Sequence, residues 1–329
     1  MKIENSNVLV IGGAGFIGSF VVSELLKYPV RKVVIYDNFS RGNKSYLEQQ
    51  LKDERCFIFP YGGDIREIDI LNKAMEDIDY VISLAAMWLL HCKDYPRTAF
   101  DVNIAGTFNI LEACVNNKIK KLIWSSSASV YGDAVQIPMT ESHPFNNKNF
   151  YGASKIAGEA MATAFNDRYG LNVIGLRYMN VYGPHQDQTA AYTGVVPIML
   201  NKIEANEAPI INGDGSQAYD FIYVEDVARS NIDAILSDRS FGMYNVGTET
   251  QTTINELCEL ILEMKNSSLK VKYNPYSEDD SRAMVKNRIG SMEKAYNEIG
   301  FKYKYKLREG LQKLIDWRLE TGVDKMDLF

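Results

Sequence analysis

A glycine-rich turn near the start of the chain constrains the fold more than any other segment. Residues 7–11 form an apolar, β-branched run, and Gly12, Gly15 and Gly18 follow at intervals of three. Over residues 16–26, apolar side chains recur at helical spacing. This order predicts a strand, a tight turn and a helix whose N-terminal amides can approach an anionic group closely. Tight turns of this kind also use glycine for packing alone, so the turn by itself does not define a ligand.

Asp37 gives the turn a more specific meaning. It ends the next predicted strand, residues 33–36, and lies 19 residues beyond Gly18. An acidic side chain in this place accepts hydrogen bonds from the ribose hydroxyls of a dinucleotide and repels a 2′-phosphate. The sequence therefore predicts NAD rather than NADP as the cofactor. Arg41 keeps NADP as an alternative, because a nearby arginine can receive that phosphate.

Strand and helix patterns alternate through the first half of the chain. The predicted strands span residues 7–11, 33–36, 56–59, 80–84, 121–124 and 172–176, and the longest helical patterns span residues 96–116 and 151–169. Such alternation predicts right-handed crossovers and a parallel sheet with helices on both faces. The predicted fold class is α/β, a Rossmann-type doubly wound parallel sheet with a smaller α/β C-terminal substrate domain.

The second half of the chain changes character, because prolines and the turn at 213–215 break it into shorter elements. We expect an NAD-binding Rossmann domain over residues 1–176, rejoined by residues 220–247. Residues 177–219 and 248–329 are then expected to form a domain that binds the substrate.

Composition excludes several classes of function. A net charge of −6 argues against nucleic-acid binding, which needs clustered Lys and Arg. The longest apolar run, residues 81–90, is too short to cross a bilayer. The first predicted strand begins at residue 7, which leaves no room for a signal peptide, and the four cysteines show no paired spacing. These features favour a cytoplasmic protein. His91 and His143 stand apart from other ligand types, so no metal site is expected.

Tyr151 and Lys155 carry the chemical interpretation. On a helix, residues four apart lie on one face, one turn from each other. A free phenol has a pKa near 10, and an adjacent ammonium favours the phenolate, so the pair suits a general base near neutral pH. A hydroxyl from the serine cluster at residues 125–129, expected at the end of the preceding strand, can pass the proton on.

Three further segments supply candidate residues, and one of them, residues 84–86, falls where a dinucleotide crosses the sheet edge. Residues 64–65 follow the third strand and suit an adenine contact, with a helix cap as the alternative. Small residues at 84–86 end the fourth strand. Asn103 lies at a polar break in the long helical pattern, which favours a structural or proton-relay role, with a plain surface residue as the alternative.

Together these motifs resemble those of the extended short-chain dehydrogenases/reductases, in the NAD-dependent nucleotide-sugar epimerase/dehydratase group. Residues 177–184, 213–217 and 220–227 resemble two substrate-side motifs of that group, so the resemblance covers nearly the whole chain. Within that group the chain resembles UDP-glucose and UDP-glucuronate 4-epimerases.

The resemblance implies roles for individual residues. The catalytic residues are then Ser127, Tyr151 and Lys155. The cofactor-binding set is Gly12, Gly15, Phe16, Ile17, Gly18, Asp37, Asn38, Ser40, Arg41, Gly42, Asp64, Ile65, Leu84, Ala85, Ala86, Asn103, Ser125, Tyr151, Lys155 and Tyr178. The substrate-binding set is Trp88, Ser126, Ser127, Ser129, Tyr151, Asn180, Val195, Tyr219, Arg282 and Arg288.

Departures from the family's patterns narrow the reaction. The 4,6-dehydratases of the group carry Asp-Glu directly after the catalytic hydroxyl, whereas this chain has Ala128 and Ser129. The decarboxylases usually place Glu where Ser129 stands. We therefore expect a nucleotide-sugar epimerase, acting at carbon 4 of a UDP-hexose or UDP-hexuronic acid through a 4-keto intermediate. The alternatives are a dehydrogenase, reductase or decarboxylase of the same fold and, more remotely, a non-catalytic NAD-binding regulator.

Two expectations concern the substrate's charge and the assembly. An Arg that relatives place before Asp220 to contact phosphate is replaced by Tyr219, so Arg282 or Arg288 is expected to compensate. In the family, helices equivalent to residues 96–116 and 151–169 pair across a two-fold axis into a four-helix bundle. A homodimer is therefore expected, unless the apolar stripes of these helices only cover the sheet.

Overall fold

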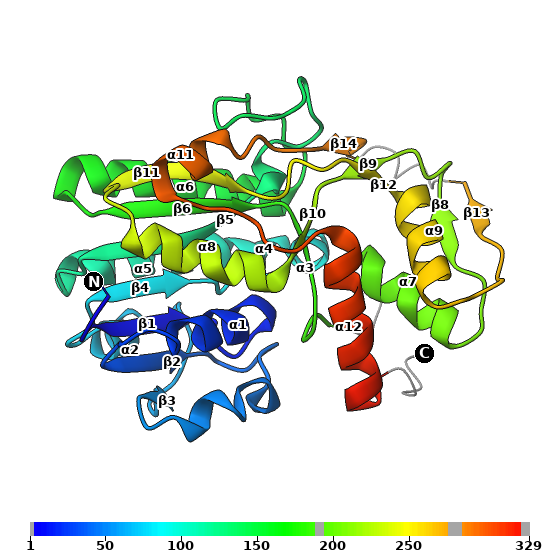
Figure 1. Ribbon diagram of the computed structural model, residues 1–329. Helices are drawn as coiled ribbons and strands as arrows, with labels where there is room; N and C mark the ends of the chain where they lie inside the picture. The colour runs from blue at the N-terminus through cyan, green and yellow to red at the C-terminus, as the bar shows by residue number, and fades with distance from the viewer. Residues whose placement is uncertain (1–2, 188–193, 276–284, 324–329) are drawn as a thin grey trace.

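The computed structural model describes residues 3–187, 194–275 and 285–323 (Figure 1). Seven parallel strands form its central sheet, in the order β11-β6-β5-β4-β1-β2-β3. Their bounds are β1 Asn7–Ile11, β2 Lys32–Tyr36, β3 Cys56–Ile58, β4 Tyr80–Ser83, β5 Lys121–Ser127, β6 Val173–Tyr178 and β11 Phe241–Val246. The doubly wound α/β fold predicted from the alternating pattern is confirmed.

Both faces of the sheet are buried, which explains why its strands are apolar without interruption. In β1, Val8 and Val10 join one hydrophobic cluster, whereas Leu9 and Ile11 join the other. Successive side chains of a strand point to opposite faces, so a strand covered on both sides needs an apolar residue at every position.

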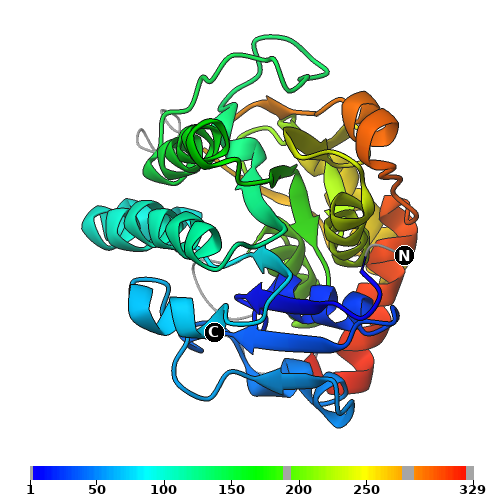
Figure 2. The same ribbon diagram turned by 90° about the vertical axis from the view of Figure 1, so that its left-hand side faces the viewer.

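Two helix layers cover these faces, and Figure 2 shows the sheet between them. Side chains of α1 (Phe16–Leu25), α8 (Val224–Leu236) and α11 (Glu293–Ile299) belong to the first cluster. Those of α2 (Ile68–Ala74), α5 (Gly106–Asn116) and α6 (Phe150–Tyr169) belong to the second. Short 3-10 helices lie between strands at Lys44–Leu47, Gln50–Lys52 and Ala128–Val130.

The helix expected over residues 96–116 has three parts. α4 (Pro96–Ala99) leads into a π-helical segment, Phe100–Ala105, and then into α5. A further short helix, α3 (Leu89–Asp94), precedes them. Such wide turns are rare within helices and often occur at functional sites. Asn103, which the polar pattern singled out, lies in the π-helical segment.

A smaller part of the molecule lies beyond one end of the sheet, at the right of Figure 1. Its helices are α7 (Val195–Glu204), α9 (Ile254–Met264) and α12 (Leu307–Thr321), which pack around a third hydrophobic cluster. Its short strands are β7 Asn180–Tyr182, β8 Ile210–Asn212, β9 Ala218–Tyr219, β10 Phe221–Tyr223, β12 Thr252–Thr253, β13 Lys272–Asn274 and β14 Asn287–Arg288. They form three small sheets, β10-β7, β12-β9-β14 and β13-β8.

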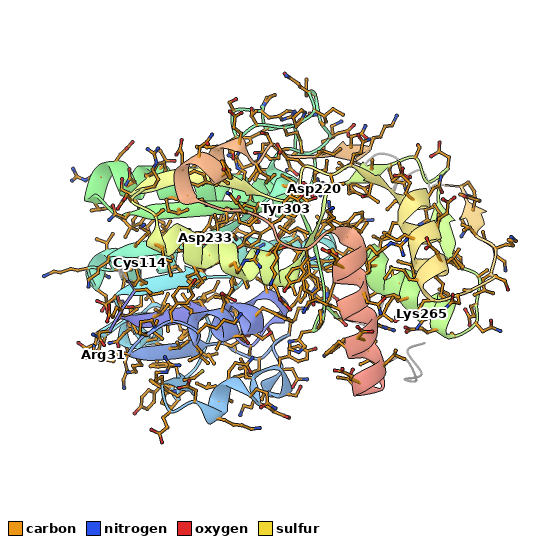
Figure 3. The ribbon with its side chains drawn as sticks, in the orientation of Figure 1. Arg31, Cys114, Asp220, Asp233, Lys265 and Tyr303 are labelled. Carbon is orange, nitrogen blue, oxygen red and sulfur yellow. The ribbon has the colours of Figure 1, made fainter. Side chains whose placement is uncertain are left out.

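Asp220 links the two parts, between β9 and β10 (Figure 3). Its fully buried carboxylate accepts hydrogen bonds from the backbone nitrogens of Thr248 and Glu249 and from the Thr248 hydroxyl, at 2.7–3.0 Å. Burial raises the pKa of this carboxyl to about 6. These bonds fix the start of β10 to the loop after β11, and so hold the smaller part against the sheet edge.

Within the described ranges, no helix has the length and apolar character needed to span a membrane.

Candidate active site

The parallel register brings the predicted site segments to one edge of the sheet. At the carboxyl ends of the strands, Ile11 lies opposite Tyr36 and Ser83, and Ser127 lies opposite Tyr178. In open α/β sheets, ligands bind in the crevice at this edge. The glycine turn, Asp37, residues 84–86 and the serine cluster therefore meet there.

The glycine turn requires glycine for steric reasons. Gly12 has a φ of +79°, and a Cβ on it would lie 2.8 Å from the backbone nitrogen of Ala85. A Cβ on Gly18 would lie 2.0 Å from the oxygen of Gly12, so α1 can start this close to the turn only without one. No side chain caps α1, which leaves its N-terminal amides facing the sheet edge. Phe16 and Ile17 in its first turn pack against the hydrophobic cluster of the smaller part.

Asp37 is anchored beside the turn. Its carboxylate accepts hydrogen bonds from the backbone nitrogens of Ala14, at 2.9 Å, and Phe39, at 2.8 Å. Burial raises the pKa of Asp37 above its usual range, and these amides oppose the shift. A Cβ on Gly42 would lie 2.7 Å from Oδ1 of Asp37, so the following loop folds closely over the carboxylate.

Arg41 is engaged by groups other than a cofactor phosphate. Its guanidinium forms an ion pair with Asp187, at 3.1 Å, and lies 5.4 Å from the ring centre of Trp88. Three segments, after β2, β4 and β7, are joined by this contact. Trp88, which the sequence placed in the sugar pocket, therefore lies under Arg41 at the start of α3.

The adenine-side residues are held by contacts within the protein. Asn38 accepts a hydrogen bond from the backbone nitrogen of Ser40, at 3.0 Å. Asp64 accepts from Nε of Arg66, at 3.0 Å, and from its NH2, at 2.6 Å. The side chain of Ile65 is buried in the core, where it packs against α5, so an adenine contact through this side chain is not supported.

The serine cluster divides between the two faces of β5. Ser127 accepts a hydrogen bond from the backbone nitrogen of Ser129, at 3.1 Å, and its hydroxyl is within hydrogen-bonding reach of Tyr151. Ser126 points the other way: its hydroxyl is buried and donates to Glu159, at 2.6 Å. Strand alternation turns Ser126 into the core, so its hydroxyl is bound by a protein group, and a sugar contact stays a prediction. Ser129 is also buried.

Tyr151 and Lys155 lie on one face of α6, with the ammonium 5.7 Å from the phenol ring centre. The ammonium donates to the backbone oxygen of Ser125, at 2.7 Å, and lies 4.9 Å from the ring of Trp124. Burial raises the pKa of Tyr151 to about 12, against the opposing hydrogen bond with Ser127, and burial lowers the pKa of Lys155 to about 8. The expected lowering of the phenol's pKa by Lys155 is not found: burial is the largest cause of the shift, and the groups that oppose it are Ser127 and Arg288.

A buried ion pair that the sequence analysis missed lies behind these groups. Arg177 donates from Nε to one oxygen of Glu159, at 2.8 Å, and from NH2 to the other, at 2.6 Å. Its NH1 donates to the Tyr131 hydroxyl, at 2.7 Å, which donates in turn to Asn245, at 2.6 Å. The network joins α6, β6, β11 and the segment after β5. Glu159 lies one turn beyond Lys155, and that helical spacing was the available signal.

The side chain of Asn103 is held by hydrogen bonds within the protein. Its Oδ1 accepts from the backbone nitrogen of Met87, at 2.6 Å, and its Nδ2 donates to the oxygen of Met87, at 3.0 Å, and to the hydroxyl of Ser154, at 3.1 Å. It therefore fixes the loop after β4 to α6. The thiol of Cys92 lies 3.6 Å from the same Nδ2.

The remaining predicted site residues, of the cofactor and the substrate sets, lie around β6, β7, α7 and β9. The hydroxyl of Tyr178 donates to Asn231, at 3.0 Å, and the amide of Asn180 donates to the oxygen of Asp220, at 3.2 Å. Val195 is the first residue of α7. Tyr219 donates to the oxygen of Val285, at 2.8 Å, and lies opposite Arg288 in the pairing of β9 with β14. Arg282 lies outside the described residues.

The arrangement along this sheet edge is that of an extended short-chain dehydrogenase/reductase. Residues 8–247 match the NAD dependent epimerase/dehydratase family, and the chain belongs to that family. It is 35% identical over 313 residues to a putative UDP-glucose 4-epimerase of Methanocaldococcus jannaschii, a match that covers 94% of this chain and 97% of that protein.

Solved structures agree with this assignment. The UDP-N-acetylglucosamine 4-epimerase of Methanobrevibacter ruminantium, in complex with UDP-N-acetylmuramic acid, superimposes with a TM-score of 0.90 at 35% identity, covering 97% of this chain and 99% of that one. The UDP-glucose 4-epimerase of Thermus thermophilus, in complex with NAD, gives a TM-score of 0.83 at 29% identity, covering 94% and 98%. The protein is thus an enzyme of the nucleotide-sugar epimerase type.

NAD is the cofactor of this family, and the described residues fit it. The turn, where Gly12 and Gly18 leave no room for a Cβ, suits a pyrophosphate. The carboxylate of Asp37, which backbone amides hold in place, suits ribose hydroxyls. When bound, NAD supplies the group that accepts and returns hydride.

We expect the buried ion pair to contribute far more to stability than an exposed one. Glu159→Gln leaves the guanidinium of Arg177 buried without its carboxylate, and should lower the free energy of unfolding by roughly 3–5 kcal/mol. Glu263→Gln is the matched control, because its pair with Arg308 is exposed, with side-chain exposures of 67% and 56% against 6% and 4%. It should cost below about 1 kcal/mol. Equal losses in urea unfolding would contradict this reading.

Lys155 should make stability depend on pH with a definite sign. Its pKa is about 8 in the folded protein and near 10.4 in an unfolded chain. Between these values the unfolded state binds more protons, so stability relative to Lys155→Met should rise with pH, by about 3 kcal/mol at most. The difference between the two proteins' unfolding free energies, measured from pH 7 to pH 10.5, tests this. A difference that stays flat or falls would show that the folded ammonium is not desolvated; Lys302→Met, at an exposed position, is the control.

Proposed function

We propose that the protein is an NAD-dependent 4-epimerase of a UDP-linked hexose or hexuronic acid, which acts through a transient 4-keto intermediate. The observation that carries this proposal is Tyr151, partly buried beside Ser127 and Lys155 at the carboxyl edge of the sheet. The family assignment supports a nucleotide-sugar substrate, and the relatives named above as 4-epimerases support the position of attack.

In this proposal Tyr151 removes the proton of the substrate's 4-hydroxyl, with Ser127 in the hydrogen-bond path. Ser127 and Arg288 both act to lower the pKa of Tyr151, against burial, so they favour the phenolate that the reaction needs. Lys155 holds its charge close by on the same helix face. The 4-keto sugar must then present its other face before hydride returns, and the enclosing side chains keep it in place meanwhile.

The residues after Ser127 favour epimerisation over elimination or loss of carbon dioxide. Losing water from the sugar needs an additional acid and base beside the ring. Ala128 and Ser129 carry no carboxylate, and Glu159, the nearest acidic residue on α6, is held by Arg177.

The same proposal divides the chain into a cofactor-binding part, residues 1–176 with 220–247, and a sugar-binding part formed by the rest.

The protein is also proposed to form a homodimer through α5 and α6. Phe108 and Tyr169 project from these helices with exposures of 44% and 59%, and both rings contact Phe165, at centre distances of 5.4 Å. Phe100, in the π-helical segment, is 48% exposed. An apolar stripe of this kind on two adjacent helices suits a four-helix bundle between two copies.

Light scattering coupled to size exclusion should therefore give twice the chain mass of 37.2 kDa. Phe108→Glu places a charge in the bundle and should shift the protein to the monomer, whereas Tyr296→Glu, an equally exposed ring on α11, should not. A monomeric parent, or a dimer that Phe108→Glu leaves intact, would contradict the bundle.

The reaction is tested by following the sugar protons of UDP-, GDP-, CDP- and dTDP-sugars by NMR. Formation of the 4-epimer without added NAD supports the proposal, because the cofactor is regenerated in each cycle. Loss of water or carbon dioxide, or stoichiometric accumulation of reduced nicotinamide, would replace it with one of the family's other reactions.

Tyr151→Phe tests the assignment of the base. It should lower turnover by roughly 10²–10⁴-fold or more while NAD remains bound, because general base catalysis contributes about that much. Tyr296→Phe, on the outer face of α11, is the matched control and should retain full activity. Retained activity in Tyr151→Phe would exclude the phenol as the base.

A further inference from the structure

Arg288 has an unusual position for a charged side chain. It lies in β14, opposite Tyr219 of β9, in the small sheet β12-β9-β14. Asp133, in the segment after β5, accepts hydrogen bonds from the backbone nitrogens of Lys286, at 2.8 Å, and Asn287, at 3.2 Å. β14 is therefore fixed next to the segment that follows the catalytic serine.

The side chain of Arg288 is only partly buried, but one of its nitrogens is buried without a hydrogen-bond partner. Its Nε is fully buried and has no hydrogen-bond acceptor, and no carboxylate in the described ranges forms an ion pair with it. Oδ1 of Asp133 already accepts hydrogen bonds from two backbone nitrogens. Burial lowers the pKa of Arg288 below its usual range, and the neighbouring Tyr219, Asp133 and Tyr151 oppose the shift. A partly buried cation with an unpaired, buried nitrogen gains from an incoming anion.

Two observations indicate the chemical class of the anion that would bind Arg288. The planar fork of a guanidinium matches the two oxygens of a carboxylate or a phosphate. Arg288 also lies close enough to Tyr151 for each charge to affect the other. Tyr151 must reach the hydroxyl at the reacting carbon of the sugar, so Arg288 lies at the hexose end of the substrate.

We propose that Arg288 binds a carboxylate carried by the hexose, and so makes the site selective for an acidic nucleotide sugar, such as a UDP-hexuronic acid, over a neutral one. This inference rests on the proposed function, which leaves the two substrate classes open. Arg288 is then a specificity-determining residue, and Tyr219, which has no charge, contributes none of this selectivity.

The test measures binding by calorimetry in the Tyr151→Phe holoenzyme, so that the sugars are not converted. The ligands are UDP, UDP-glucose and UDP-glucuronate. Without further change, UDP-glucuronate should bind more tightly than UDP-glucose. Adding Arg288→Met should weaken UDP-glucuronate by roughly 10- to 100-fold, the range of a lost charge-assisted pair, and change UDP and UDP-glucose by no more than about threefold. Arg288→Lys should retain part of the preference, because it keeps the charge but loses the fork.

Arg308→Met, which removes an exposed arginine of α12, is the control for net charge and should leave all three affinities unchanged. Thermal unfolding checks the fold: Arg288→Met should unfold no earlier than its parent, since it removes a partly buried cation whose buried Nε has no hydrogen-bond partner.

Three results of these binding measurements would contradict the proposal or the function on which it rests. An equal loss for UDP and both sugars would overturn the proposal and assign Arg288 to the diphosphate. Unchanged affinities in Arg288→Met would show that Arg288 does not contact the substrate. If the Tyr151→Phe holoenzyme binds none of the three ligands, the nucleotide-sugar function itself fails, which is a different result from unchanged selectivity.

Discussion

The ion pair between Glu159 and Arg177 is the interaction on which the rest of the site depends. It ties α6 to β6 inside the core, where both side chains are almost completely buried. α6 carries Tyr151 and Lys155, and β5, next to β6, carries Ser125 and Ser127. Because a buried charge pair tolerates little displacement, it fixes the distance between helix and strand, and with it the distance between the phenol and the serine hydroxyl.

Local constraints made the fold and the cofactor side predictable from sequence. The spacing of Gly12, Gly15 and Gly18 reflects backbone contacts within one turn, and alternating strands and helices specify a parallel sheet. These patterns need no knowledge of distant residues. Strand alternation alone also predicts that Ser126 faces away from Ser125 and Ser127. Its hydrogen-bond partner, Glu159, is accordingly in the core.

Contacts between distant segments were not predictable in the same way. Glu159 and Arg177 come from different elements, and Arg288 meets Tyr219 only through the register of β14 with β9. The sequence could not distinguish Arg282 from Arg288 for the same reason, because a local pattern specifies neither the register of a strand nor the burial of its side chains. The pKa of Tyr151 depends on burial as well, which explains why the Tyr-Lys spacing alone suggested a lower value than the structure gives.

The three consecutive serines of β5 differ in how freely they can be replaced over evolutionary time. Lys155 is held by the main-chain oxygen of Ser125, so any side chain that fits at position 125 preserves that bond. Ser126 and Ser127 act through their hydroxyls, one toward the core and one toward Tyr151. Position 125 is therefore open to drift, whereas a change at either neighbour alters a contact that the backbone cannot replace.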